Sequence, residues 1–222
     1  MLRSLILFLV LLRPAAVATR AAPLQGAVDL QARLHARVKS YTLNADNFLD
    51  ALARVATQFQ LPMGVQWSEN SETLRKVSST WSDVDAQQII QELVNVHPGY
   101  EFDVSDGVVH VFPAWTKSSQ QDFVHLKLEK FVVDNQVPEA ATHQLRDLIK
   151  LTVSPRHSQA GAHGTIFSQA ADVGEQEISF RVQNVTVRDA LDKIALASDR
   201  KIWAVTFTDE PLTPTGFRRT RT

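Results

Sequence analysis

The stretch Val77-Ser-Ser-Thr-Trp-Ser-Asp-Val84-Asp-Ala-Gln-Gln-Ile89-Ile90-Gln-Glu-Leu93 has a counterpart in Ile178-Ser-Phe-Arg-Val-Gln-Asn-Val185-Thr-Val-Arg-Asp-Ala190-Leu191-Asp-Lys-Ile194. The two align without a gap, because Val84 matches Val185 and Leu93 matches Ile194, an offset of 101 residues. Apolar residues first alternate and then recur with helical spacing, which predicts a strand followed by a helix. We therefore predict an α+β fold of two small repeated units, each with two helices packed on short mixed β-sheets.

The N-terminus has the three parts of a secretory signal peptide. Arg3 supplies a positive start, residues 5–12 are apolar without interruption, and Ala16-Val-Ala18 forms an A-x-A cleavage pattern. The apolar run would rise only ~12 Å as a helix, against a hydrocarbon core of ~30 Å. We predict a cleaved signal peptide over residues 1–18 and no permanent membrane anchor. Residues 19–40 are predicted to form a loose leader in which Leu30, Leu34 and Val38 are spaced for a helical turn.

The first predicted unit covers residues 41–113. Asn47 is a candidate N-cap, and apolar residues from 48 to 59 form one helical face. Either Asp83 or Asp85 caps a second helix, and Asp106-Gly107 marks a hairpin turn. The predicted order is strand, helix, strand, strand, helix and a hairpin of two strands, whose final strand we expect at a sheet edge.

A polar linker over residues 114–121 leads to the second predicted unit, residues 122–207. Pro138 suits the first position of a helix, and either Asn184 or Thr186 begins another. Residues 154–176 are rich in Gly, Ala, Ser and His, which predicts a mobile loop. Residues 201–207 form the last predicted strand, and residues 208–222 a disordered tail.

The first unit resembles the secretin and TonB short N-terminal domain. The resemblance rests on residues 41–67, a strand, a Leu-x-x-Ala-Leu-like helix and a strand, and on residues 77–112 with their Asp-Gly hairpin. The second unit looks like a more distant relative. The resemblance implies protein–protein contact in the periplasm. It does not imply pore formation or transport, since neither a ring domain nor a barrel follows the match.

Composition and motifs disfavour most catalytic chemistry. The chain has no cysteine, so thiol nucleophiles, thiolate metal sites and disulfides are excluded. Its formal net charge of −1 gives no basic face for nucleic acid. It lacks a GxSxG elbow and an HExxH or HxxxH pair, and its loop histidines, His157 and His163, have no acidic companion nearby. We expect no enzyme activity, cofactor or metal.

The sequence therefore favours an exported, periplasmic or secreted adaptor, free or associated with the outer membrane. Its expected partner is an envelope protein, such as a secretin-like or TonB-system component, in secretion, transport or signalling. The hairpin's final strand, with Val108, His110 and Phe112, is the predicted contact surface, because edge strands can accept a partner strand. The alternative is a sensor or carrier that binds a small ligand between the two units. The sequence leaves the oligomeric state open.

Overall fold

The computed structural model describes residues 25–68, 72–118, 123–152, 165–167, 176–198 and 202–207. The predicted signal peptide and C-terminal tail lie outside these ranges, as does most of the predicted loop 154–176. The described chain is α+β, as predicted, with helices packed on a five-stranded sheet of mixed strand direction and on two antiparallel two-stranded ladders.

The first half follows the predicted order of elements. Asn47 caps the first predicted helix by accepting a hydrogen bond from the Asp50 amide at 2.8 Å, and Asp85 caps the second in a capping box with Gln88. The hairpin turns at Asp106 and Gly107, which both take positive φ angles. The elements are β1 (Val38–Ala45), α2 (Phe48–Phe59), β2 (Met63–Ser68), β3 (Val77–Val84), α3 (Ala86–Asn95), β4 (Tyr100–Ser105) and β5 (Val108–Pro113).

The second half has the order strand, helix, strand, strand, helix, strand. Pro138 opens its first helix, and Thr186 caps its second in a capping box with Asp189. The elements are β6 (Lys127–Gln136), α4 (Pro138–Thr152), β7 (Thr165–Phe167), β8 (Ile178–Thr186), α5 (Val187–Ala197) and β9 (Ile202–Phe207), preceded by two short 3₁₀ helices, η1 (Ala114–Ser118) and η2 (Phe123–His125).

Three segments predicted to lack regular structure are ordered. The leader contains α1 (Gln25–Leu34), because Leu30 and Leu34, one turn apart, bury their side chains in the first apolar core. The linker contains η1, whose Trp115 packs against the second core. The predicted mobile loop contains β7, which pairs with β9. Each segment is held by contacts distant in sequence, which its own composition does not reveal.

The offset of 101 residues also appears in local geometry. Asp83 and Asn184 both take positive φ angles, 49° and 52°. Two residues after each of them, Asp85 and Thr186 are the N-caps of α3 and α5. The equivalence ends after the helices. In the first half the next strand, β4, pairs with β5, whereas β9 pairs with β2 and β7. The matched sequence thus specifies a strand–helix element rather than the sheet that follows it.

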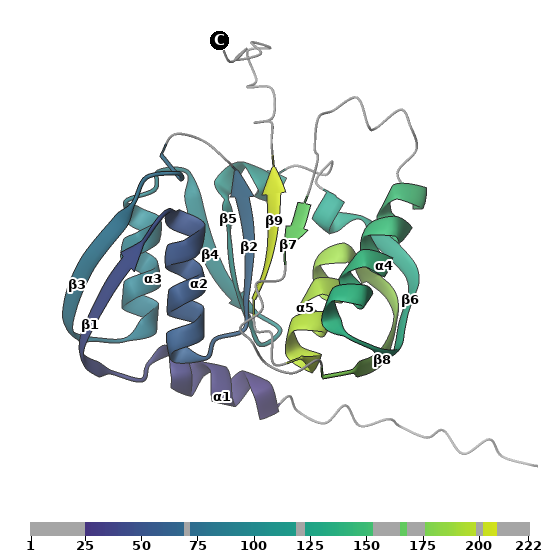
Figure 1. Ribbon diagram of the computed structural model, residues 1–222, viewed down its shortest axis with the longest axis horizontal. Helices are drawn as coiled ribbons and strands as arrows, with labels where there is room; N and C mark the ends of the chain where they lie inside the picture. The colour runs from purple at the N-terminus through teal and green to yellow at the C-terminus, as the bar shows by residue number, and fades with distance from the viewer. Residues whose placement is uncertain are drawn as a thin grey trace, which may run out of the picture.

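Figure 1 shows the elements stacked in five layers. The β1–β3 ladder lies on the left, followed by α2 and α3, a central five-stranded sheet, α5 with α4, and the β6–β8 ladder on the right. The central sheet has the order β4-β5-β2-β9-β7. Its inner strands β2 and β5 are buried along their whole length, because helices cover both faces of the sheet.

This sheet crosses the boundary between the two predicted units, residues 41–113 and 122–207. β9, from the second half, pairs in parallel with β2, from the first, along the whole of β2. Its side chains alternate between the two apolar cores: Ala204 joins the core under α2 and α3, while Trp203 and Val205 join the core under α5. Two apolar cores exist, and one sheet forms a wall of each.

The two halves approach very closely at Gly64 of β2. Its register partner on β9 is Trp203, and a Cβ atom at position 64 would lie 2.2 Å from Cζ2 of the indole ring. No side chain larger than hydrogen fits there without moving the ring. A hydrogen bond also fixes the ring, because Trp203 Nε1 donates to Asp192 Oδ1 at 2.8 Å. Gly64 is therefore required for the indole to cover β2.

We expect Gly64→Ala to lower the free energy of unfolding by about 1–3 kcal/mol, the usual cost of overpacking a core. Chemical denaturation followed by tryptophan fluorescence or circular dichroism measures the loss. The control is the same substitution in a Trp203→Leu background, where the clash is removed and the added cost should fall. An equal cost in both backgrounds would show that the indole is not what excludes a side chain at position 64.

Candidate functional site

The predicted contact residues are buried. Val108, His110 and Phe112 are only 0%, 2% and 3% exposed. Their strand, β5, lies between β4 and β2, so the assignment of β5 to a sheet edge is wrong; β4 is the edge. The sequence itself indicates that β5 is an inner strand. Residues 108, 109, 111 and 112 are all apolar, which is the pattern of a strand buried on both faces. A proline at position 110 would remove a donor from an inner strand rather than an edge.

His110 instead forms the centre of a polar cluster that joins the two halves. Its Nε2 atom lies 3.1 Å and 3.0 Å from the two carboxylate oxygens of Asp192 on α5. Asp192 is itself buried and also accepts the hydrogen bond from Trp203 of β9. One carboxylate therefore links α5 to β5 and β9 in a region from which water is excluded.

Arg188, one turn before Asp192 on α5, completes the cluster. Its Nη2 atom lies 2.8 Å from His110 Nδ1, 3.0 Å from Ser105 Oγ and 3.2 Å from Asp103 Oδ1. A guanidinium only donates, so we assign Nδ1 of His110 as the acceptor and Nε2–H as the donor to Asp192. Asp103 and His110 are cross-strand partners in the β4–β5 hairpin. The hairpin and α5 are thus joined by complementary charges.

The order Ser105–His110–Asp192 has the composition of a hydrolase triad. Ser105 Oγ lies 3.2 Å from His110 Nδ1, and the other ring nitrogen contacts the aspartate. A general base needs a free lone pair directed at the nucleophile. Here the Arg188 guanidinium lies closer to that lone pair than the serine does. The arrangement suits a structural link between the halves better than proton transfer from Ser105.

In the sequence alone, neither Asp192 nor Trp203 belongs to a recognisable motif. Trp203 is in the core, but Asp192 is a buried acid that was not singled out. Two weak signals were available. Asp192 follows Arg188 by one helical turn, and the Asp106-Gly107 turn places Asp103 opposite His110. Neither signal indicates that α5 packs on the hairpin of the other half.

Two further kinds of site, a metal site and a membrane span, have no candidate in the described ranges. No three histidine or acidic side chains there are grouped so that they could hold a metal ion. None of the helices in that part of the chain combines the length and apolarity needed to cross a membrane. His157 and His163 lie outside the described residues.

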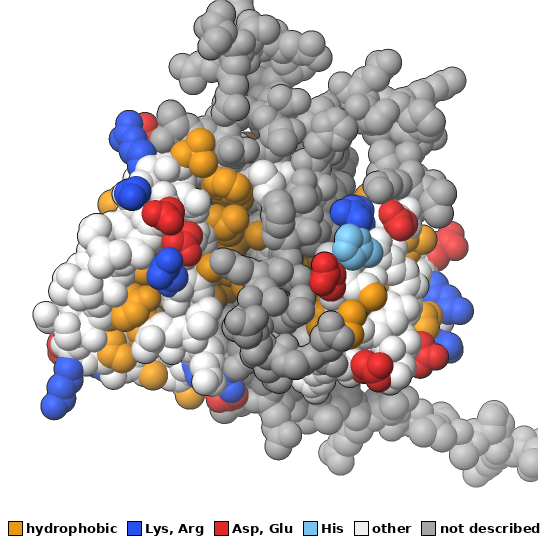
Figure 2. All heavy atoms as spheres, viewed as in Figure 1, with side chains coloured by type: hydrophobic (Ala, Val, Ile, Leu, Met, Phe, Trp, Pro, Cys, Tyr) orange, Lys and Arg blue, Asp and Glu red, His pale blue; other side chains and the backbone are white. Residues whose placement is uncertain are grey.

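The outer face of the β1–β3 ladder consists of small uncharged polar side chains. Ser40 is paired with Ser82, Thr42 with Thr80, and Asn44 with Ser78, and all six residues are exposed. The two threonine hydroxyls lie 3.2 Å apart, and the Ser78 hydroxyl donates to the Asn44 side chain at 2.7 Å. This flank is largely white in Figure 2, in contrast to the charged side chains of the opposite flank.

The inner face of the same ladder is aromatic. Tyr41 stacks on Trp81 with ring centroids 6.0 Å apart and meets the edge of Phe59 at 5.6 Å. Burial raises the pKa of the Tyr41 phenol above its ordinary value of 10.0, although the nearby Arg54 guanidinium opposes that shift. The ladder is therefore amphipathic, with aromatic rings against α2 and hydroxyl groups toward solvent.

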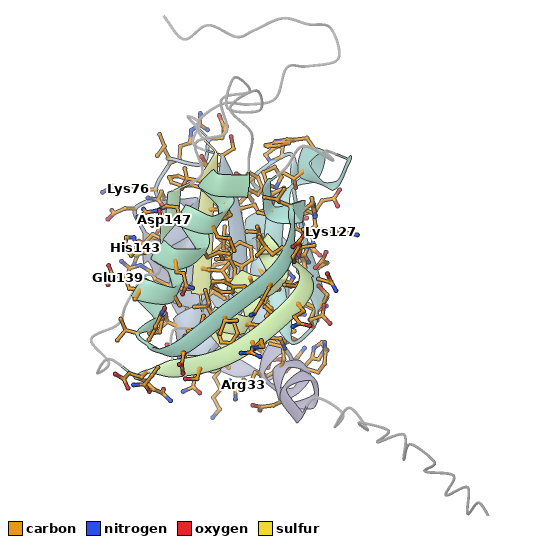
Figure 3. The ribbon with its side chains drawn as sticks, turned by 90° about the vertical axis from the view of Figure 1, so that its right-hand side faces the viewer. Arg33, Lys76, Lys127, Glu139, His143 and Asp147 are labelled. Carbon is orange, nitrogen blue, oxygen red and sulfur yellow. The ribbon has the colours of Figure 1, made fainter. Side chains whose placement is uncertain are left out.

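The β6–β8 ladder on the other flank carries charge. Lys130 is paired with Gln183, and Arg181 with Val132. Both cations are exposed, and Glu129 and Asp134 are exposed on the same strand as Lys130. Figure 3 shows this ladder across the front of the molecule, with Lys127 near one end. The two outer ladders occupy similar places in the fold but offer different chemistry.

No protein-family model matches this chain, and neither a curated protein nor a solved structure matches it. The resemblance stated from the sequence therefore rests on the sequence of residues 41–67 and 77–112 alone.

We expect Asp192→Ala to lower the free energy of unfolding by several kcal/mol. The substitution leaves the Trp203 indole N–H and the His110 Nε2–H without their acceptor, and each unpaired buried donor costs about 1–3 kcal/mol. Chemical denaturation measures the change, with Asp134→Ala on an exposed position as the control. Equal stability of the two variants would contradict the role assigned to Asp192.

Tyr41 gives a pH-dependent expectation. A raised pKa means that folding favours the neutral phenol, so the stability it contributes is complete below pH 10 and is lost as pH rises through the raised pKa. The chain has two tyrosines, so Tyr100→Phe leaves Tyr41 as the only phenol. Its absorbance titration should have a midpoint above 10.0 in the folded protein and a lower one in denaturant. Coincident midpoints would contradict the burial of Tyr41.

Proposed function

We propose that this protein is an exported, non-enzymatic adaptor that mediates protein–protein contact in the cell envelope. The observation that carries the proposal is the presence of two exposed strand ladders on opposite flanks of one continuous packed body. The buried polar cluster around His110 joins the two halves. The surfaces left for recognition are therefore strand faces and strand edges, which bind proteins by backbone pairing and side-chain complementarity.

The arrangement of the first half supports the resemblance to the secretin and TonB short N-terminal domain. Its strands, helices and Asp-Gly hairpin follow the order that the resemblance implies. Such domains contact other envelope proteins, and a secretin-like or TonB-system component is the proposed partner here. The predicted signal peptide supports a periplasmic or secreted location, free or at the outer membrane.

The β6–β8 flank is the proposed partner face in place of the β5 residues. Lys130 and Arg181 are exposed on adjoining strands, and long cationic side chains attract a complementary acidic surface before contact. Arg181 can also form bidentate hydrogen bonds with a carboxylate. A partner with an acidic strand or loop fits this face better than it fits the neutral β1–β3 flank.

The second candidate function, a carrier of a small ligand between the halves, has one observation in its favour. Three buried polar atoms on the β2–β9 pair have no hydrogen-bond partner: Gln66 Oε1, Trp67 Nε1 and Thr206 Oγ1. A small polar ligand could satisfy such atoms. Native mass spectrometry of protein purified without denaturation would detect a bound small molecule, and a mass equal to that of the bare chain would exclude this candidate.

We expect Lys130→Glu/Arg181→Glu to weaken capture of the envelope partner about tenfold or more, equivalent to about 1.4 kcal/mol. Cross-linking in the periplasm followed by mass spectrometry identifies the partner, and titration with the purified partner measures the loss. Lys39→Glu/Arg75→Glu, which makes the same change of charge on exposed residues of the first half, is the matched control. Equal losses in the two variants would indicate a general charge effect, and turnover of a substrate would refute the adaptor function.

A further inference from the structure

The polar cluster around His110 holds more negative than positive charge. Two carboxylates, Asp103 and Asp192, and one guanidinium, Arg188, lie within 3.3 Å of the ring nitrogens. Two negative charges and one positive charge leave one negative charge in excess when the imidazole is neutral, and one more proton on the ring would cancel it. Histidine is the side chain that ordinarily gains a proton between about pH 8 and pH 5. The cluster therefore contains both a place for a proton and a charge that the proton would neutralise.

The side chains that face His110 belong to several elements. They are Asp103 and Ser105 of β4, Arg188 and Asp192 of α5, and Trp203 of β9. The register partner of His110 on β2 is Gly64, which has no side chain. Glu101, the next side chain on the same face of β4, lies opposite Phe112 and adds a further acid near the cluster. Within this set only Arg188 is a cation, so it is the one group that opposes a positive charge on the ring.

Arg188 and a proton cannot both occupy Nδ1 of His110. The guanidinium lies 2.8 Å from that nitrogen, and since a guanidinium only donates, the contact requires Nδ1 to carry no proton. A proton there would bring two donors and two positive charges together. Two acceptors are already within reach of the same nitrogen, Asp103 Oδ1 at 3.3 Å and Ser105 Oγ at 3.2 Å. The ring can therefore change its partner without turning over.

The two sides of the ring differ in their access to water. The side chains of His110 and Asp192 are only 3% and 6% exposed, whereas those of Arg188 and Asp103 are 20% and 42% exposed. A change of protonation is therefore accommodated on the Nδ1 side, where the guanidinium can return to water and a carboxylate can take its place. The contact of Nε2 with Asp192 needs no change, because Nε2 carries a proton in both states.

We propose that His110 is a proton-operated switch in the packing of α5 on the β4–β5 hairpin. In the neutral state Nδ1 accepts a hydrogen bond from Arg188, which ties α5 to the hairpin. When Nδ1 takes a proton from solvent, it donates to Asp103 of the same hairpin and Arg188 leaves Nδ1. The bond from Nε2–H to Asp192 persists and becomes an ion pair. Acidification thus removes one of the two ties between α5 and the ring. This inference concerns the contact between the halves and does not depend on the adaptor function.

The stability that Arg188 contributes should depend on pH. We expect Arg188→Met to raise the equilibrium constant for unfolding about tenfold at pH 8, where the tie to Nδ1 is intact, and by much less at pH 5, where the wild type has released it. Chemical denaturation of the full chain at the two pH values measures both changes. In a His110→Gln background the cost of Arg188→Met should no longer depend on pH. Arg37→Met is the matched control, since Arg37 is exposed and pairs with the exposed Asp83, and its small cost should be equal at both pH values.

NMR of the imidazole nitrogens follows the proton directly. The His110 signals, identified by their absence from His110→Gln, should show the Nε2–H tautomer at pH 8 and a doubly protonated ring at pH 5. Arg188→Met should move this protonation to higher pH, because it removes the opposing cation. Asp103→Asn should move it to lower pH, because it removes the carboxylate that receives the new N–H. His143→Gln, on exposed α4 (Figure 3), is the control and should leave it unchanged.

Three results would overturn the proposal. One is a His110 ring that stays neutral at pH 5, or a wild type that unfolds, as followed by circular dichroism, before the ring is protonated. Another is an equal cost of Arg188→Met at pH 8 and pH 5. The third is a protonation of His110 that occurs at the same pH in Arg188→Met as in the wild type, since the guanidinium would then not compete with the proton.

Discussion

The parallel pairing of β2 with β9 is the contact on which the rest of the structure depends. It brings a strand from the end of the described chain beside one from its first half, and it makes one sheet serve as a wall for both apolar cores. The indole of Trp203 covers Gly64, and Asp192 fixes the indole and His110 together. Without this pairing the cores would still have helices and outer ladders, but each would lack part of its central wall.

Local elements could be predicted from the sequence because their determinants are local. Asn47, Asp85 and Thr186 begin helices because their side chains accept hydrogen bonds from amides three residues ahead. The hairpin at Asp106 and Gly107 follows from the positive φ angles that its turn needs. Such interactions depend on a few neighbouring residues, and their patterns can be recognised in one chain without knowledge of its tertiary contacts.

The contact between the halves could not be predicted in the same way. Parallel pairing of β9 with β2 depends on space beside Gly64, which no local pattern reveals, and burial of Asp192 depends on α5 meeting the hairpin of the other half. The prediction that placed His110 at a sheet edge is wrong for a similar reason, since the order of strands in a sheet also depends on contacts distant in sequence. An antiparallel hairpin fixes which strands are neighbours, but only the position of β2 decides which of β4 and β5 becomes the edge.

The two ends of the β2–β9 pair differ in a way that bears on how the halves hold together. At its start, the Trp203 indole lies against Gly64 and donates its N–H to Asp192 of α5. Toward its end, Gln66, Trp67 and Thr206 each bury a polar atom without a partner, at a cost of about 1–3 kcal/mol each. The contact between the halves is therefore more stabilising at the end of the sheet nearest His110. It is less stabilising at the carboxyl ends of β2 and β9. Local opening of the joint should begin at those carboxyl ends, because less is lost there when the strands part.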